Sequence, residues 1–563
     1  MGLEFAFIGG IMSKLQPSAQ SSASSDSTSP QLWWQKGIIY QIYPRSFADS
    51  NEDGVGDLNG IIRHLDYLQW LGVDALWLSP VYPSPMADFG YDISNYTDID
   101  PLFGTLADFD KLVKEARARN LHLVMDFVPN HTSDQHPWFK ESRSSRDSPR
   151  RDWYLWKDAK PDGSPPNNWL SMFGGSAWEW DEKTGQYYYH GFLKEQPDLN
   201  WRNPEVVKAM SDVLRFWLER GVDGFRVDVL WHIIKDDQWR DNPPNPSFDP
   251  ATEPNYNSLE PVYSTDRPEV HEITMELRRV IESYGPDKFV IGEVYLPLEK
   301  LMAYYGPKAD GAHMPYNFLL ALIDWQSSTI MQAVGQYEAL LPEGAWPNWV
   351  LGNHDKPRIA SRIKPHQVRG AQLLLLTLRG TPTMYYGDEL GMHDEAIAPT
   401  QVQDPFEKRE PGKGNGRDPE RTPMRWNQEP GAGFTSSETP WLPIGDNIEV
   451  NVASEKDDPD SILNMVQQLI AIRRKYPVLQ SGSYDALPAS PPVIAFTRTL
   501  QSESLHIVIN LGDSVTLYPM GRVQAKCIFS TDSARDLDLV LMNELALAPG
   551  EGVILTIEGE PAD

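Results

Sequence analysis

The chain has 563 residues, enough for two to four domains with a large buried core. It carries 79 acidic and 50 basic residues, and its net charge of −29 disfavours nucleic acid and anionic lipid as partners because both are polyanions. The single cysteine, Cys527, excludes an internal disulfide framework and a cysteine-rich metal site, and no apolar run reaches the roughly 20 residues of a membrane span.

The first residues differ in composition from the rest of the chain. Residues 13–30 are rich in Ser, so we expect residues 1–32 to form a disordered tail, with translation starting at Met1 or Met12. The apolar stretch Phe5–Met12 is short and has no Lys or Arg before it, unlike a secretory signal. The lack of such a signal and the single cysteine favour a cytoplasmic location.

Short β-rich runs alternate with helical patterns from Trp33 onward. The β-rich runs are almost continuously apolar, as in parallel strands that are buried on both faces. Their repetition predicts the α/β class and a (β/α)8 TIM barrel in two parts, residues 33–128 and 199–477. The expected strands are Gly37–Tyr43, Asp74–Ser79, Leu121–Val128, Val222–Val229, Lys288–Glu293 and Trp349–Gly352, and the expected helices include Leu58–Leu71, Leu106–Asn120, Pro204–Arg220 and Pro365–Leu378.

Three stretches interrupt this alternation. Residues 129–198 hold turn residues, Trp and short β pieces such as Gln186–Tyr189, so we expect a small domain inserted after the third strand. Residues 393–445 are rich in Pro, Gly and charge and predict a long irregular loop. Residues 478–563 lose the helical periodicity and predict a C-terminal all-β sandwich domain. Its expected strands include Val493–Thr497, Leu505–Asn510 and Val553–Ile557.

Unusual polar residues stand at the ends of four predicted strands. The C-terminal strand ends of such a barrel form one face, so Asp228, Glu293 and Asp355 are expected to converge on one site. Three carboxylates suit either acid/base chemistry at a glycosidic bond or a metal site. A surface network of ion pairs is a sufficient explanation for any one of these strand ends taken alone. The four ends are Asp126–His131, Gly224–Asp228, Gly292–Glu293 and Gly352–Asp355.

Two of these carboxylates have different neighbours in the sequence. Arg226 lies two residues before Asp228 on the same strand, so both side chains face the same way, and a fixed cation keeps a carboxylate ionised. A nucleophile needs that ionised state. Glu293 has no cation nearby in the sequence, so we expect it to be held protonated as a general acid.

The four stretches, in this order, resemble the signature regions of the α-amylase family of glycoside hydrolases, glycoside hydrolase family 13. A fifth region stands just before the barrel resumes, and its QPDLN form at Gln196–Asn200 is similar to the oligo-1,6-glucosidase and α-glucosidase branch. The resemblance runs from about Trp33 into the C-terminal domain and also covers Trp33–Phe47 and Arg417–Trp426.

This resemblance implies cleavage of a glycosidic bond with retention of configuration. Asp228 would be the nucleophile that forms a covalent glucosyl-enzyme, Glu293 the general acid and base, and Asp355 the group that stabilises the transition state. Retention needs two carboxyl groups about 5 Å apart, one charged and one protonated, which agrees with the neighbours described above. The side chains that match the family's sugar-binding residues are His131, Arg226 and His354.

The resemblance also places residues at the non-reducing end of the first sugar site. Asp88 can accept hydrogen bonds from terminal hydroxyls, and Tyr91 can stack on the sugar ring. Arg421 matches an arginine that closes this end in α-glucosidases, and Phe173 and Phe192 fall where the family lines the pocket, although rings also fill cores. Together these residues imply a blind pocket that removes one glucose at a time from short oligosaccharides.

Linkage preference is inferred from the residue after the nucleophile. In many enzymes of the branch that favour α-1,6 bonds this residue is a Val, and here it is Val229, so the resemblance implies α-1,6 cleavage with α-1,4 bonds also accepted. The following Leu230–His232 departs from that branch, and His232 is interpreted as structural. The alternative is a sucrose- or trehalose-type isomerase or an α-glucosyl transferase, because these share the chemistry up to the covalent intermediate. A catalytically dead relative is disfavoured because the carboxylates are present.

An acidic loop follows the first predicted strand. It has the ligand spacing of the first part of a calcium loop, with Gly54 at position 6, but position 12 is Gly60, so it is not an EF-hand. The loop resembles the metal site of the oligo-1,6-glucosidase branch, which implies a structural Ca²⁺, with Mg²⁺ or a merely solvated acidic turn as alternatives. No organic cofactor is expected. The implied ligands are Asp49, Asn51, Asp53, the carbonyl of Val55, and Asp57.

Overall fold

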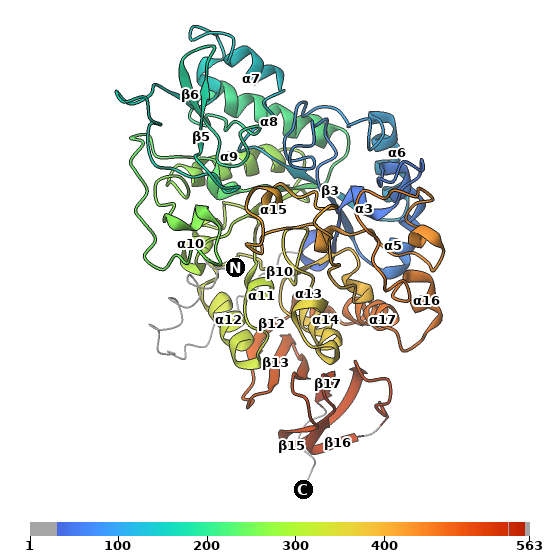
Figure 1. The fold of residues 1–563 in the computed structure, drawn as a ribbon. Helices are drawn as coiled ribbons and strands as arrows, with labels where there is room; N and C mark the ends of the chain where they lie inside the picture. Colours follow the sequence, from blue (N-terminus) through green and yellow to red (C-terminus); the bar gives the residue numbers. More distant parts are fainter. Residues whose placement is uncertain (1–30, 539, 558–563) are drawn as a thin grey trace.

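The computed structural model describes residues 31–538 and 540–557. The predicted disordered tail, residues 1–32, lies outside the described residues except for Gln31 and Leu32. Within the described part of the chain, no helix has the length and apolar character needed to cross a membrane. The barrel and its helices lie between the inserted region, in teal, and the C-terminal sheet, in red (Figure 1).

Eight parallel strands form the central sheet in chain order, and the sheet closes because the strands at its two ends, β9 and β10, lie side by side. The predicted (β/α)8 TIM barrel is therefore confirmed. Six strands were expected from the sequence, whereas the sixth and eighth, β9 and β11, were not. The barrel strands are β1 (Ile39–Ile42), β2 (Ala75–Leu78), β3 (His122–Phe127), β7 (Gly224–Val227), β8 (Phe289–Glu293), β9 (Met314–Tyr316), β10 (Asn348–Val350) and β11 (Thr381–Tyr385).

The barrel interior is packed with side chains and is not an open channel. Trp77, Val124, Phe289 and Ile291 belong to one buried apolar cluster inside the barrel. Side chains that alternate with them along the strands pack outward against the helices. Gly224 is required in β7 because a Cβ atom there would lie 2.5 Å from the Phe289 ring on the next strand.

Amphipathic helices cover the outside of the barrel, and several of them have capped starts. Thr105 and Asp108 form a capping box at α6, and Asn203 caps α8 ahead of Pro204 in its first turn. The predicted helix Leu58–Leu71 is divided at His64. The longer helices are α4 (Leu58–Arg63), α5 (Leu65–Leu71), α6 (Leu106–Ala118), α8 (Pro204–Glu219), α9 (Val270–Glu282), α10 (Leu298–Ala303), α12 (Ser327–Leu340), α14 (Val368–Thr377), α16 (Val452–Asp457) and α17 (Ile462–Lys475). The shorter ones are α2 (Trp33–Lys36), α3 (Pro44–Phe47), α11 (Leu319–Leu322), α13 (Ile359–Arg362), α15 (Pro405–Arg409) and α18 (Pro477–Ser481).

Two smaller sheets flank the barrel, where the sequence predicted them. The insert between β3 and β7 holds helix α7 (Pro137–Ser142) and a three-stranded antiparallel sheet of β4 (Trp156–Lys157), β6 (Gln186–Tyr189) and β5 (Trp178–Asp181). The C-terminal domain is all β, with one face packed on the barrel helices and a second face that buries its own apolar cluster. Its strands, antiparallel throughout, are β12 (Ser483–Ala486), β13 (Val493–Leu500), β14 (Glu503–Asn510), β15 (Thr516–Ser530), β16 (Val540–Leu547) and β17 (Gly552–Ile557).

Candidate active site

The three predicted carboxylates come from the C-terminal ends of three barrel strands. Asp228 directly follows β7, Glu293 is the last residue of β8, and Asp355 lies five residues beyond β10. Asp228 and Glu293 are buried, at 6% and 2% exposure, whereas 22% of the Asp355 side chain is exposed. The structure thus brings these side chains to one face of the barrel, as expected.

Arg226 is the centre of the buried charge network. Its Nη1 lies 2.7 Å from Asp228 Oδ1 and 2.8 Å from Asp126 Oδ1, and its Nη2 lies 2.5 Å from Glu293 Oε1. The ion pair between Arg226 and Asp228 is therefore present as predicted. Glu293 has no cation nearby in the sequence, but it has one in space, because the Arg226 guanidinium reaches from β7 to the neighbouring strand β8.

The two buried carboxyl groups hold protons more tightly than usual. Burial raises the pKa of Asp228 well above its ordinary value and also raises the pKa of Glu293, and in both cases it outweighs the opposing charge of Arg226. Arg226 lowers the pKa of Asp228, as expected of a fixed cation beside a carboxylate, but burial raises it by more. Since Asp126, Asp228 and Glu293 share one guanidinium, their charges balance best when the three carboxyl groups retain a proton between them, and the three titrate as a coupled set.

Val229, directly after Asp228, has a strained backbone. Its φ of 38° and ψ of 46° fall in the left-handed region, which a β-branched residue adopts at a cost of about 1–3 kcal/mol. This conformation lets the Val229 N–H donate to Glu293 Oε2 at 2.8 Å. This hydrogen bond holds the Glu293 carboxyl group in place next to Asp228, since Val229 directly follows Asp228 in the chain.

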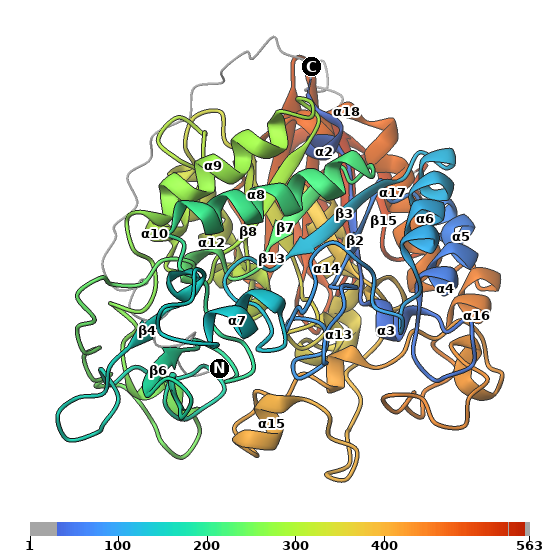
Figure 2. The same cartoon turned by 90° about the horizontal axis from the view of Figure 1, so that it is seen from above.

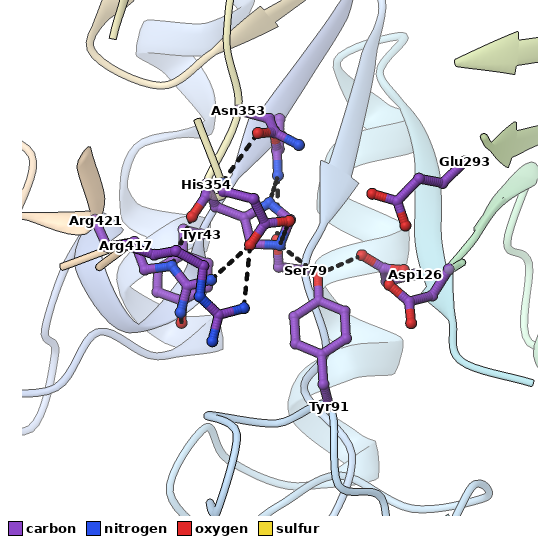
Figure 3. A network of polar contacts seen from close by, with 12 residues as sticks. Tyr43, Ser79, Tyr91, Asp126, Glu293, Asn353, His354, Arg417 and Arg421 are labelled. Carbon is purple, nitrogen blue, oxygen red and sulfur yellow. Dashed lines mark hydrogen bonds and ion pairs between the residues drawn. The ribbon is translucent and has the colours of Figure 1, made fainter. Parts of the chain in front are cut away.

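Asp355 has a different environment from the other two carboxylates. Arg421 Nη2 lies 2.7 Å and Arg417 Nη1 lies 3.3 Å from its Oδ1, and His354 Nε2 lies 3.3 Å from its Oδ2. Burial alone would raise its pKa, but His354 and the two arginines together lower it. Asp355 is therefore ionised. Figure 3 shows Arg417 and Arg421 on the opposite side of Tyr91 from Asp126 and Glu293.

Tyr91 links two of the signature strand ends. Its hydroxyl lies 2.6 Å from His354 Nε2 and donates to Asp126 Oδ2 at 2.9 Å (Figure 3). Gln41 Nε2 lies 2.7 Å from the other ring nitrogen of His354. The Tyr91 and His354 rings also stack, with centroids 5.5 Å apart. Burial lowers the pKa of His354 well below its ordinary value, so this predicted sugar ligand is neutral.

Asp88 and His131 lie together at the other end of the site. Asp88 Oδ1 accepts from Arg417 Nη2 at 2.7 Å, and its Oδ2 accepts from Gln196 Nε2 at 3.2 Å. The same Gln196 nitrogen lies 3.1 Å from His131 Nε2, and burial lowers the pKa of His131 to about 4. Arg421 was predicted to close this end, but the guanidinium that binds Asp88 belongs to Arg417.

Aromatic rings border this end of the site. Phe192 lies 5.2 Å from the His131 ring and 6.3 Å from Phe173, between ring centroids. Phe173 in turn stacks on Phe406 at 4.0 Å, and the guanidinium carbon of Arg417 lies 5.3 Å from the Phe173 ring. Both predicted rings are therefore close to the charged groups of the site, and both are almost fully buried.

The acidic loop at 49–57 is held by its own backbone and by a distant segment. The Asp49 carboxylate accepts from the N–H groups of Asn51, Glu52 and Gly54 and from the Thr435 hydroxyl. Asp57 caps α4 by accepting from Gly60 N at 2.7 Å. Among residues 31–538 and 540–557, no group of three or more carboxylate, imidazole or thiol side chains is arranged to hold a metal ion. The predicted ligands differ from such a group, because they include the Asn51 side-chain amide and the Val55 backbone carbonyl.

Sequence reasoning missed several residues of this network. Asp126 was noted among the polar strand-end residues but was given no role; it is in register with Arg226 on the neighbouring strand. Gln196 and Arg417 both stand in motifs that were recognised, but neither was singled out. Asp404, which binds Arg417, lies in the irregular loop and gives no signal in the sequence.

A closed parallel barrel with acidic and arginine side chains clustered at its C-terminal strand ends has the form of an enzyme active site, and neighbouring buried carboxyl groups suit the cleavage of a glycosidic bond. Residues 41–482 match the model of the α-amylase catalytic domain. The chain belongs to the α-amylase family of glycoside hydrolases and is a glycoside hydrolase of the α-glucosidase and oligo-1,6-glucosidase type.

Two similar proteins align with most of this chain. A probable α-glucosidase of Rhizobium meliloti (strain 1021) is 43% identical over 87% of this chain and 92% of its own length. An oligo-1,6-glucosidase of Parageobacillus thermoglucosidasius is 39% identical over 94% of this chain and 99% of its own.

Two proteins with solved structures of the same fold are named for other activities. The α-glucosyl transfer enzyme XgtA is 39% identical, with a TM-score of 0.88. The isomaltulose synthase of Erwinia rhapontici NX5 is 37% identical, with a TM-score of 0.85. Each comparison covers 94% of this chain and 100% of the other.

Proposed function

We propose that this protein is a retaining, exo-acting α-glucosidase that removes terminal glucosyl residues from short oligosaccharides. One observation carries the proposal: a single buried guanidinium, that of Arg226, holds Asp228 Oδ1 on Nη1 and Glu293 Oε1 on Nη2. Two carboxyl groups held on one planar cation are close enough to act on the same anomeric carbon. A separation of about 5 Å, typical of retaining enzymes, leaves no room for a water between them and the sugar.

The mechanism has two displacement steps. In the first, the Asp228 carboxylate attacks the anomeric carbon while the proton retained by the buried carboxyl groups is on Glu293, the glycosidic bond breaks, and Glu293 gives that proton to the departing oxygen. In the second, the Glu293 carboxylate takes a proton from water, the water oxygen attacks the same carbon, and the bond to Asp228 breaks. Asp355, held ionised by Arg421 and Arg417, stabilises the positive charge that develops on the sugar.

The other end of the site favours removal of single units. Asp88, Arg417 and Gln196 form a connected set of acceptors and donors suited to the hydroxyls of a terminal sugar. The rings of Phe173 and Phe192 border the same region, and we propose that they block a sugar chain that would extend beyond the terminal unit. Such a pocket accepts a non-reducing end, and we propose that it takes α-1,6 bonds, α-1,4 bonds or both.

A second candidate is an α-glucosyl transferase or a sucrose-type isomerase. The likeness to XgtA and to isomaltulose synthase favours it, and only the acceptor that replaces water differs. The test is incubation with maltose, isomaltose, sucrose, trehalose and maltoheptaose, with products followed by proton NMR. Release of glucose from maltose or isomaltose supports the glucosidase. Conversion to new disaccharides with little glucose supports the second candidate, and cleavage inside maltoheptaose contradicts the exo pocket.

We also propose that the loop Asp49–Asp57 holds a structural Ca²⁺ or Mg²⁺, through Asp49, Asn51, Asp53, the Val55 carbonyl and Asp57. The first three side chains each accept the N–H two residues on, at 2.9, 3.1 and 2.8 Å, so the loop curls around their oxygens. Burial would raise the pKa of Asp49, but hydrogen bonds from Thr435 and the loop backbone lower it, as a metal ligand requires.

Removal of this metal is expected to lower the melting temperature by about 5 °C or more, because only the folded loop binds it. Calorimetry after dialysis against a chelator measures the shift, and added Ca²⁺ should reverse it. Asp53→Ala should abolish the response, whereas Asp162→Ala should not, since Asp162 sits in a similar exposed turn outside the loop. An unchanged melting temperature, with no metal found by mass spectrometry, would contradict the site.

A further inference from the structure

Asp404 makes a three-point contact with Arg417 across an irregular loop. Its Oδ1 accepts from Arg417 Nε at 3.0 Å and from Nη2 at 2.7 Å, and its Oδ2 accepts from the Arg417 backbone N–H at 2.9 Å. Asp404 is fully buried. In return, Asp418 Oδ2 accepts the backbone N–H of Asp404 at 3.0 Å, so both ends of the segment are fixed to each other.

The same guanidinium faces two residues of the proposed site. Arg417 Nη2 lies 2.7 Å from Asp88, and its Nη1 lies 3.3 Å from Asp355. Its flat group is bordered by two rings, Phe173 at 5.3 Å and Phe406 at 5.2 Å from the guanidinium carbon. Arg417 thus has three carboxylate partners, of which Asp404 alone belongs to neither end of the proposed sugar site.

The segment between Asp404 and Arg417 also joins the loop to the inserted domain. It contains α15, and Figure 2 shows α15 projecting on the same side of the molecule as β4 and β6. Phe406 in α15 stacks on Phe173, and Arg409 donates from Nε to Phe173 O at 2.9 Å and from Nη2 to Gly174 O at 3.1 Å. The contact between Asp404 and Arg417 therefore lies where the barrel, the loop and the insert meet.

We infer that Asp404 is a positioning residue that sets the donor-sugar pocket by fixing the orientation of the Arg417 guanidinium toward Asp88 and Asp355; this inference rests on the proposed function. Three carboxylates share one guanidinium, and Asp404 holds its Nε and Nη2 together with the backbone of Arg417. Without the charge of Asp404, the guanidinium loses this fixed orientation, and Asp88 is no longer held in place to accept hydrogen bonds from the sugar. The loss falls on binding of the non-reacting end of the sugar, which raises KM more than it lowers kcat.

The test is a double-mutant cycle with Asp404→Asn and Arg417→Ala on p-nitrophenyl α-glucoside. Alone, D404N is expected to raise KM about tenfold with kcat changed less than about threefold. In the R417A background, D404N should change kcat/KM by less than about twofold, because its effect passes through Arg417. Asp223→Asn is the matched control: Asp223 is a buried, ion-paired aspartate at the opposite end of β7, and D223N should leave KM unchanged.

Two results would overturn the inference. One is a D404N effect that multiplies fully with that of R417A, and the other is a lowered melting temperature with KM unchanged, since both indicate a purely structural role. Should D404N not fold, Asp404→Ser takes its place in the cycle, and failure of both variants to fold likewise indicates a structural role. If the wild-type protein releases no p-nitrophenol, the proposed function itself fails, and the two failures are distinguishable.

Discussion

Replacing Asp228 by Asn is expected to lower kcat on α-glucosides by about 10⁴-fold or more, because the amide cannot form the covalent glucosyl-enzyme. The fold should survive, since Asn has nearly the same shape and can still accept a hydrogen bond from Arg226. Initial rates on p-nitrophenyl α-glucoside, measured at saturating substrate, give the loss directly. A variant with turnover within about 100-fold of wild type would contradict the assignment of Asp228 as the nucleophile.

A further prediction concerns how the stability of D228N depends on pH. Burial raises the pKa of Asp228 in the folded state, so the stability contributed by its proton is present at low pH and is lost as the pH rises through the folded-state pKa. Asn does not titrate, so D228N should gain stability relative to wild type as the pH rises. Melting temperatures of both proteins between pH 5 and 8 measure this difference. A stability difference between the two proteins that stays constant, or that moves against D228N as the pH rises, would contradict it.

Replacing Glu293 by Gln is expected to lower kcat/KM on maltose by about 10²–10⁴-fold, because the departing sugar oxygen no longer receives a proton. The loss on p-nitrophenyl α-glucoside should be smaller, since nitrophenolate leaves without protonation. The ratio of the two losses therefore separates proton donation from substrate binding. Equal losses on both substrates would mean that Glu293 does not act as the general acid.

The pH dependence of wild type and of Glu293→Gln follows from the pKa of Glu293. Burial raises the pKa of Glu293, so the protonated acid persists to higher pH than an exposed glutamate would allow, and wild-type kcat/KM falls only above that pKa. In Glu293→Gln the alkaline fall should disappear, because the titrating group is gone. Asp223→Asn should keep the wild-type profile. An unchanged alkaline limb in the Glu293 variant would assign that limb to another group.

The barrel strands differ in how far their sequences predict them. β3 and β8 are apolar runs, and their burial on both faces is visible in the sequence. β9 and β11 read MPY and TPTMY, and each holds a proline and too few apolar residues to stand out. Their pairing comes from closure of the barrel, a tertiary constraint that local pattern does not contain.

The residues of the active site also differ in how far the sequence predicts them. Asp228, Glu293 and Asp355 were predictable because parallel topology brings strand ends together. The reach of Arg226 to Glu293 was not predictable, because sequence spacing describes neighbours on one strand and not across two. The contact of Asp404 with Arg417 joins two points of an irregular loop, where no periodicity indicates which side chains meet.

The direct test of the central claim is the anomeric form of the first glucose released from maltose or isomaltose, followed by proton NMR before mutarotation. Two displacements at one carbon, through Asp228 and then water, predict α-glucose as the initial product, with the β form appearing only later. Initial release of β-glucose would mean a single displacement by water and would contradict the covalent intermediate on Asp228.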